Sequence, residues 1–291
     1  MTGIPDREPR MDTYATERVG KPREDLSGLA VRQPYRSAGP WLSPDALELL
    51  GMLGPRAVVG VSPDGSELVT KRGGLGMFEK GGNAAALEEL KRSELANDDG
   101  KLTSAGLLCT QPLRETLGAW RITARLGGRQ SLLQLWTGAD GDALVLAGPS
   151  GHEHVMADPA QGQFSGHAQM DYIRAGEAAG VVTSWLGIGP SWFHQEPPFA
   201  LESHVYDARL QDRMAPPPAP APGPAELWEH PWLGWQVEGE DGASVTFINA
   251  GSAGQYLVHA EYGKAVFERV PARNVYRHLA TMFLGAGVAP G

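Results

Sequence analysis

The sequence has almost no cysteine and no long apolar run. Its single cysteine, Cys109, excludes an internal disulfide, and such sparing use of thiols is typical of a reducing compartment. No stretch approaches the ~20 consecutive apolar residues that a membrane-spanning helix requires. The chain also does not open with a charged and then apolar segment of the kind that directs secretion. We therefore expect a cytoplasmic protein that neither spans a membrane nor uses a signal peptide.

Positive charge is scarce relative to negative charge. The 291 residues contain 25 Lys and Arg against 34 Asp and Glu, which gives a formal net charge of −9 at pH 7. Because an acidic protein repels phosphate groups, we expect neither nucleic acid nor an anionic membrane as a partner. Hydrophobic residues make up 42% of the chain and charged residues 20%, which is the composition of a globular protein with a sizeable core.

Motifs for common chemistry are also missing. The glycine-rich stretch 72–82 continues with Asn83, so Gly82-Asn83 stands where a phosphate-binding loop requires Lys followed by Ser or Thr. His152 and His154 would lie on one face of a strand and could hold a metal, but no third ligand follows at a spacing typical of a metal site. We therefore predict no metal, no cofactor and no enzymatic activity. Replacing both histidines with alanine should leave folding and binding unchanged.

The C-terminal part carries the clearest pattern. Apolar residues alternate with others on both sides of the turn 249–254, which predicts two strands, and 265–270 predicts a third. Pro271 is suited to the first turn of a helix, where its missing N–H is not needed. In that helix, four apolar residues share one face: Val275, Leu279, Met282 and Phe283. We predict a strand meander with an amphipathic helix packed on it.

The first part of the chain predicts more helices and a second meander. Ser43 is a suitable N-cap for a helix over 44–53, whose stop signal is Gly54-Pro55. The remaining predictions are a hairpin over 56–71, helices over 84–96 and 103–118, strands between 120 and 157, a helix over 167–185 and a strand over 199–205. Pro112 should kink or split the second of those helices.

These elements predict an α+β fold of antiparallel β-meanders packed with helices, whose plan suggests two pseudo-repeated halves. Residues 1–40 are polar and rich in proline, so we predict a disordered or loosely docked arm. Residues 41–214 form the first α+β part, 215–225 are a proline-rich connector, and 226–291 add a meander and the last helix to the same globule.

Several conspicuous residues receive structural roles. Trp228, Trp232 and Trp235 follow the connector, and tryptophans in such a position most often pack in a core or at a junction. Cys109 is interpreted as a buried structural thiol. The acidic pairs Glu88-Glu89 and Asp98-Asp99 are interpreted as solvated charges of a helix and a turn.

The order of elements resembles the EspG family, cytosolic chaperones of type VII (ESX) secretion in actinobacteria. The resemblance covers roughly residues 42–284, and Gln255 replaces the basic residue of the family's pattern. It rests on five segments: Ser43-Pro44-Asp45-Ala46-Leu47, residues 94–102, Val245-Thr246-Phe247-Ile248-Asn249, Gly254-Gln255-Tyr256-Leu257-Val258 and Phe267-Glu268-Arg269-Val270-Pro271-Ala272.

This resemblance implies a non-enzymatic chaperone. Members of the family bind a helical secretion substrate of PE/PPE type, keep it soluble and address it to the secretion machine, and they have no catalytic residues. The implied partner of this chain is therefore a helical PE/PPE- or WxG-like protein. Two alternatives stay open: a structural or interaction protein of another actinobacterial or phage system with the same α+β plan, and a metal-dependent enzyme that uses His152 and His154.

Two stretches of the sequence could supply the apolar surface that a chaperone needs. The loop 74–78 places Leu75, Met77 and Phe78 among glycines. Trp185, Trp192 and Phe193 come from a stretch that Gly187, Gly189 and Pro190 interrupt. We predict that these six bulky residues bind the partner; the alternative is that they fold back onto their own core.

Changing Met77 and Phe78 together to serine tests the first stretch. We expect the variant to lose capture of its helical partner while its free energy of unfolding falls by less than about 1 kcal/mol, the range of a surface substitution. Capture is measured by pull-down and stability by urea unfolding. A variant that unfolds, or that retains its partner, would show that this loop is not the binding site.

Overall fold

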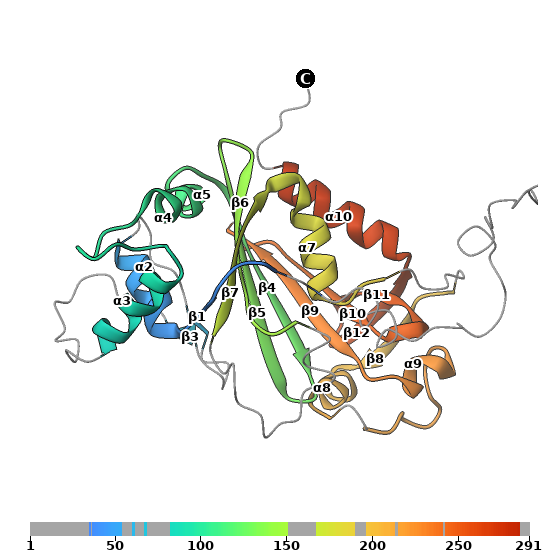
Figure 1. Cartoon of the computed structure of the whole chain (residues 1–291). Helices are drawn as coiled ribbons and strands as arrows, with labels where there is room; N and C mark the ends of the chain where they lie inside the picture. Colours follow the sequence, from blue (N-terminus) through green and yellow to red (C-terminus); the bar gives the residue numbers. More distant parts are fainter. Residues whose placement is uncertain are drawn as a thin grey trace, which may run out of the picture.

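The computed structural model describes residues 35, 37–53, 60–61, 67–68, 82–150, 167–189, 196–212, 215–240 and 242–285. Within these residues, ten strands form one antiparallel sheet and two short strands form a separate hairpin. Helices cover both faces of the large sheet (Figure 1). The predicted α+β fold of antiparallel meanders and helices is confirmed.

The first half of the sheet is a meander whose last strand pairs with a short strand from the N-terminal side. The spatial order is β1-β7-β6-β5-β4. In β4, Trp120, Ile122, Ala124 and Leu126 are buried and alternate with more exposed residues, which is the pattern of a strand packed on one face. The bounds are β1 (Trp41–Leu42), β4 (Thr116–Leu126), β5 (Arg129–Gly138), β6 (Asp142–Ala147) and β7 (Ala168–Arg174).

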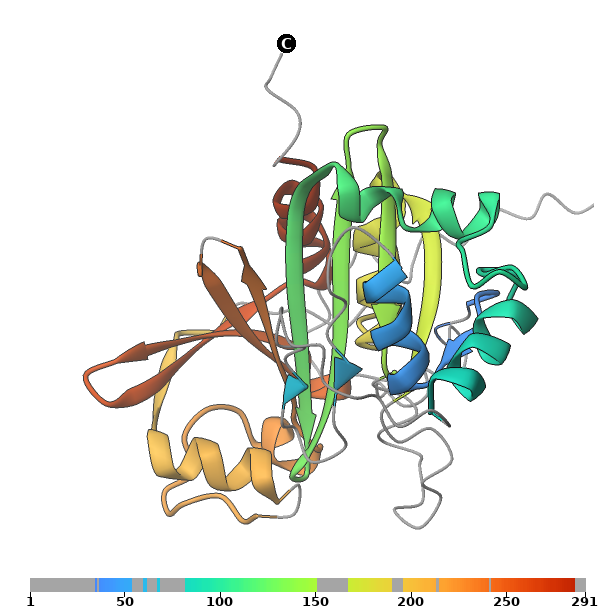
Figure 2. The same cartoon turned by 90° about the vertical axis from the view of Figure 1, so that its left-hand side faces the viewer.

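The second half repeats this plan in the order β9-β10-β11-β12-β8. A short strand again pairs with the last strand of a meander, and a helix again follows that last strand. Figure 2 shows the β11–β12 hairpin extending away from the body of the molecule. The bounds are β8 (Phe199–Glu202), β9 (Leu233–Gly239), β10 (Ser244–Asn249), β11 (Gln255–Glu261) and β12 (Lys264–Val270). The topology confirms the two pseudo-repeated halves.

The halves are joined by antiparallel pairing of β4 with β9, for example Ile122 with Val237. This pairing places the helices that follow the two meanders on the same face, α7 (Ala178–Trp185) after the 3₁₀ turn η1 (Ala175–Glu177) and α10 (Ala272–Gly285) after Pro271. The two helices lie side by side (Figure 1) and cover the largest core cluster.

The opposite face carries two smaller cores, one for each half. In the first half, β6 and β7 pack against α2, α3 and α5. In the second half, β10, β11, β12 and β8 pack against α8 and α9. The remaining bounds are α2 (Pro44–Leu53), β2 (Gly60–Val61), β3 (Glu67–Leu68), α3 (Gly82–Arg92), α4 (Ser104–Cys109), α5 (Gln111–Arg114), α8 (Ser203–Gln211), α9 (Ala225–Glu229) and η2 (Gly251–Ala253).

Three of the predicted elements need correction. The helix predicted over 167–185 is wrong in its first part, because β7 occupies 168–174 and only the portion from Ala178 is α-helical. The strand predicted over 199–205 ends at Glu202, where α8 begins. The helix predicted over 103–118 is split as expected, but the break falls at Thr110 and Pro112 lies inside α5; the last residues of the predicted helix belong to β4. In the first and third cases pairing with a neighbouring strand outweighs local periodicity, whereas in the second the pairing with β12 stops at Glu202 and a helix follows.

The proline-rich connector lies inside the second half, because β8 and α8 precede it in sequence and pack with the strands that follow it. Arg209 of α8 is buried and donates to the carbonyls of Ala215 (2.6 Å), Trp228 (2.8 Å) and His230 (2.8 Å). Its guanidinium carbon lies 5.7 Å from the ring centroids of Trp228 and Trp232. Trp232 and Trp235 are buried, which confirms their predicted core role.

The end of the N-terminal arm is docked on β7. The hydroxyls of Tyr35 and Ser37 donate to the two carboxylate oxygens of Asp171, the first at 2.6 Å. The amide of Gln169 donates to the carbonyls of Ser37 (3.4 Å) and Gly39 (3.1 Å). The Met170 N–H donates to Pro40. Residues 1–34 and 36 lie outside the described part of the chain, so the arm predicted over residues 1–40 stays a prediction there, while Tyr35 and residues 37–40 are docked.

Deleting residues 1–34 should leave the melting temperature unchanged, because that segment has too little apolar area to dock firmly. Deleting residues 1–38 should lower the free energy of unfolding by about 1–3 kcal/mol, because it removes both donors from the Asp171 carboxylate. Urea unfolding of the two truncations measures the difference. Equal stability of the two would contradict this role for Tyr35 and Ser37.

Glu89 of α3 caps the N-terminus of α2, which corrects its interpretation as a solvated charge. Its carboxylate accepts from the backbone N–H and the hydroxyl of Ser43, both at 2.7 Å. The Ser43 hydroxyl oxygen in turn accepts from the Ala46 N–H at 3.2 Å, as its predicted N-cap role requires. Charge-assisted bonds of this kind are stronger than bonds between neutral groups.

Glu89→Ala should therefore lower the free energy of unfolding by about 2 kcal/mol. The matched control is Glu88→Ala, which removes only an exposed pair with Lys91 and should change stability by less than about 0.5 kcal/mol. Chemical denaturation of the two variants checks the contrast. Equal losses would show that the cap contributes no more than a surface ion pair.

Candidate protein-binding surface

Most of the sequence-predicted site residues lie outside the described part of the chain. This holds for Leu75, Met77, Phe78, Trp192 and Phe193, and their role in binding a partner stays a prediction. The histidine pair that was considered for a metal also lies there, within 151–166. Among the described residues, no group of three His, Cys, Asp or Glu side chains is placed to hold a metal ion.

Trp185 is placed where it cannot anchor a partner. Its side chain is 0% exposed at the end of α7, inside the core that α7 and α10 share. Its indole N–H donates to the carbonyl of Gly148 at 2.8 Å, which satisfies the one polar group of the ring. The prediction that Trp185 contacts a partner is corrected: this residue packs in the core, as the alternative interpretation expected.

Large apolar side chains on the surface of the described region fall into three groups. Large apolar side chains that solvent reaches can contact another protein, so we consider each group as a candidate contact surface. The groups lie on the outer side of α10, along α4 and the start of β4, and at the tip of the β11–β12 hairpin. Their members are Tyr276 and Leu284, then Leu107, Leu108 and Leu117, and finally Tyr262.

The outer side of α10 carries a stripe at helical spacing. Val275, Leu279 and Phe283 are buried against the sheet. Beside this buried face, Tyr276 and Leu284 lie eight residues apart, and the half-buried Ala280 between them still packs against the core. Positions i, i+4 and i+8 share one side of a helix, so α10 presents a partly exposed apolar stripe along the border of its buried face.

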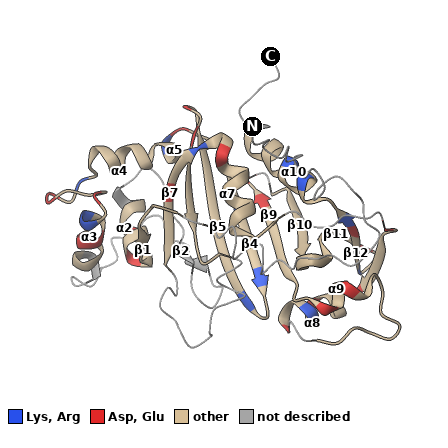
Figure 3. Cartoon of the chain, turned by 45° about the vertical axis from the view of Figure 1, so that its right-hand side comes forward, with Lys and Arg blue, Asp and Glu red and all other residues tan. Residues whose placement is uncertain are grey.

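Arginines flank this stripe. Arg273 and Arg277 are exposed, and the 14 residues of α10 include no acidic residue. Within the described residues neither arginine has a carboxylate partner, and Figure 3 shows blue without red along α10. Arg273 stands in the first turn, where the positive end of the helix dipole disfavours a cation. The stability of α10 therefore does not explain this placement.

The neighbouring helix α7 and the η1 turn before it present small side chains on their outer side. Gly180 is half-buried, and Gly176 and Ser184 are exposed. A Cβ added at Gly176 or Gly180 would meet no atom within 4 Å, so space is open above these positions. We define the α7–α10 face as Gly180 and Ser184 of α7 with Arg273, Tyr276, Arg277, Ala280 and Leu284 of α10. Small residues of this kind allow the backbone of a docking helix to approach closely.

A second apolar patch, which we call the leucine patch, consists of Leu107, Leu108 and Leu117. The first two lie on α4, whose Leu107 carbonyl accepts from Arg114 at 2.9 Å. Leu117 is the extra residue of a β-bulge between Thr116 and Gly118, and a bulge re-aims a side chain. All three are about half exposed. Cys109, next to Leu108, is only intermediate in burial, but it packs against the core of the first half, in agreement with its predicted structural role.

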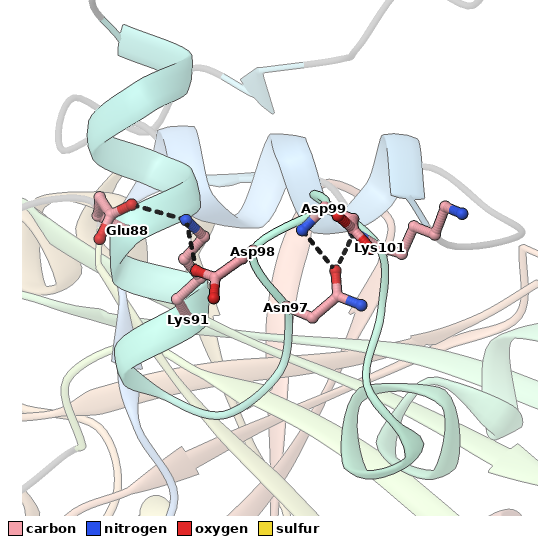
Figure 4. A network of polar contacts seen from close by, with 6 residues as sticks. All are labelled: Glu88, Lys91, Asn97, Asp98, Asp99 and Lys101. Carbon is pink, nitrogen blue, oxygen red and sulfur yellow. Dashed lines mark hydrogen bonds and ion pairs between the residues drawn. The ribbon is translucent and has the colours of Figure 1, made fainter.

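Polar clusters in the described residues have structural explanations. In the turn after α3, the Asn97 side-chain oxygen accepts from the N–H groups of Asp99 (3.1 Å) and Lys101 (2.9 Å), as Figure 4 shows. Lys91 lies 2.9 Å from Glu88 and 3.2 Å from Asp98. These bonds shape an exposed turn, in agreement with the prediction of solvated charges for Glu88, Asp98 and Asp99.

One serine–histidine contact also occurs, between the Ser252 hydroxyl and His230 Nε2 at 2.8 Å. Ser252 is only 7% exposed, and no carboxylate contact orients the imidazole in the described structure. A nucleophile needs both an accessible hydroxyl and an oriented base. The contact therefore fastens η2 to the residue after α9, and the surfaces described above are suited to binding a protein.

The sequence contained a signal for the α7–α10 face. Outside the predicted buried face, residues 272–285 include two arginines and a tyrosine, and they include no acidic residue although the chain is acidic. The sequence did not predict that α7 lies beside α10. None of the helices in the described regions is long and apolar enough to cross a membrane.

Comparisons with known proteins complete the description. No family model and no curated protein matches the sequence. Among solved structures, the chain is similar to the Mycobacterium tuberculosis type VII secretion system chaperone EspG5, solved in complex with a PE25–PPE41 dimer, at 9% sequence identity and a TM-score of 0.43. The match covers 87% of this chain and 98% of that one.

Proposed function

We propose that this protein is a non-enzymatic chaperone that binds a helical type VII secretion substrate of the PE/PPE kind and keeps it soluble for export. The observation that supports the proposal is the α7–α10 face, where a partly exposed apolar stripe runs beside a helix of small residues, with two arginines that have no carboxylate partner among the described residues. The order of sequence elements that resembles the EspG family supports the same function.

The α7–α10 face is suited to a helical partner. An amphipathic helix can place its apolar side on Tyr276, Ala280 and Leu284 while its backbone approaches α7 over Gly180 and Ser184. Tyrosine is an effective anchor because it desolvates a large area with few rotatable bonds. Covering these side chains in both proteins removes apolar surface that would otherwise promote aggregation.

Arg273 and Arg277 define the charge of the partner. Exposed arginines that lack an internal carboxylate are available to acidic residues of a docking helix, and the attraction speeds association at low salt. We therefore propose that the substrate helix carries Asp or Glu beside its apolar stripe. Leu75, Met77, Phe78, Trp192 and Phe193 remain proposed as additional partner contacts.

The central test is co-expression with a PE/PPE-type protein encoded beside this gene. Wild type should keep that protein soluble and co-purify with it, whereas Tyr276→Ser with Leu284→Ser should lose the complex at a stability cost below about 1 kcal/mol. The matched control is Leu107→Ser with Leu108→Ser, which removes exposed apolar area elsewhere and should keep the complex. A wild-type protein that leaves every such substrate insoluble would refute the proposed function.

A charge variant tests the arginines separately. Arg273→Glu with Arg277→Glu should slow association with the substrate by about tenfold at low ionic strength, and the difference should shrink as salt screens the charges. Stopped-flow or surface-plasmon measurements across a salt series follow the association rate. An equal rate for wild type and variant at low salt would exclude these arginines from the encounter.

A further inference from the structure

The tip of the β11–β12 hairpin contains a tyrosine in a conformation that tyrosine disfavours. Tyr262 and Gly263 form the two-residue loop, with φ values of 47° and 77°. Two positive φ values define a type I′ turn, whose first position favours Asn, Asp or Gly, and a bulky residue there is strained. Tyr262 is also 96% exposed, so it gains no packing within its own chain.

The turn is braced from a neighbouring element. The hydroxyl of Ser203, at the start of α8, donates to the Gly263 carbonyl at 2.7 Å. Lys264 Nζ lies 2.9 Å from a carboxylate oxygen of Glu202, at the end of β8. These contacts hold the hairpin tip in one geometry, so the aromatic ring is presented on a fixed support. A strained and exposed aromatic on a rigid turn is typical of an anchor for another molecule.

The surroundings of this anchor are acidic. Glu202, Glu261 and Glu268 are exposed on the hairpin and its edge strand, against Lys264, which is already paired with Glu202. A surface that receives Tyr262 should therefore be apolar at its centre and basic around it. The α7–α10 face of this protein has that composition, with Tyr276 and Leu284 flanked by Arg273 and Arg277.

The two surfaces cannot meet within one chain. The tip lies at the start of β12, and α10 begins after the end of β12, so the seven-residue strand separates them by about 20 Å. The tip also points away from the body of the molecule, whereas α10 packs on the sheet (Figure 2). Contact between the tip and the α7–α10 face requires a second copy of the chain.

We propose that this protein forms a symmetric dimer in which the Tyr262 tip of each copy docks on the α7–α10 face of the other. Two reciprocal contacts close the assembly about a two-fold axis, so it does not extend into a filament. The dimer would cover the apolar face while no substrate is bound, and substrate binding would release it. This regulatory consequence rests on the proposed function; the dimer itself does not.

The variant Tyr262→Asn tests the role of the tyrosine in the dimer independently of its effect on folding. Asparagine relieves the positive φ, so the variant should melt about 2 °C higher than wild type. Loss of the anchor should raise the dimer dissociation constant by about thirtyfold, as truncating an interface hot spot does. Sedimentation velocity on a dilution series of the purified full chain measures the dimer, with Leu108→Ser as the control that keeps it.

A charge exchange tests the geometry. Arg273→Glu with Arg277→Glu, or Glu261→Arg alone, should weaken the dimer. An equimolar mixture of the two variants should restore association, because both reciprocal contacts of the mixed dimer then pair opposite charges. A monomeric wild type at every concentration overturns the proposal, and so does a dimer that Tyr262→Asn leaves intact. If Tyr262→Asn leaves the dimer intact but weakens capture of the PE/PPE-type protein, the tip belongs to the substrate interface and the proposal is overturned.

The two proposals fail in different ways. A wild-type monomer that still captures its substrate refutes the dimer and retains the chaperone function. A dimer that Tyr262→Asn dissociates, in a protein that captures no PE/PPE-type substrate, confirms the dimer and refutes the chaperone function. Competition completes the test: added substrate should convert the wild-type dimer into a one-to-one complex, and a dimer that persists with substrate bound contradicts the shielding role.

Discussion

The hydrogen-bonded pairing of β4 with β9 is the contact on which the rest of the structure depends. It joins the edge strands of two four-stranded meanders, from Trp120 opposite Gly239 to Arg125 opposite Gly234. Each meander alone would leave an unpaired edge and one bare apolar face. Their union places α7 and α10 next to each other over one shared core, where Trp120 of the first half meets Phe283 of the second at 5.2 Å between ring centroids.

Buried polar contacts fix how the halves and their connections fit. Asn249, the last residue of β10, donates to the carbonyl of Leu186 after α7 at 3.1 Å, and Gln255 donates to the Asn249 side chain at 2.9 Å. Arg209 binds three backbone carbonyls around the proline-rich connector, and burial lowers the pKa of its guanidinium. In a low dielectric such bonds are strong when made and costly when broken, so they allow a single arrangement.

The pseudo-repeat separates residues that the fold requires from residues that it does not require. The α7 and α10 helices occupy equivalent places and bury equivalent faces, yet their outer sides differ. One presents Gly180 and Ser184, and the other presents Tyr276, Leu284 and two arginines. Packing in the core explains only the residues on the inner sides of α7 and α10. The two outer sides differ although both helices occupy equivalent places in the fold. Equivalent reasoning applies to the hairpin tips, because a type I′ turn forms more easily with Asn than with Tyr262.

The sequence by itself determined those elements whose signals are local: α2 with its Ser43 cap, the strands β10 to β12, the inner face of α10, and the repetition of a meander followed by a helix. Tertiary structure decided the rest. Residues 168–174 form a strand because they pair with β6. Trp185 is buried because α10, which follows much later in the sequence, packs over the same core. Glu89 became a cap because α2 lay beside α3. Local periodicity reports which side chains share a face, but the partner of that face is set by contacts distant in sequence.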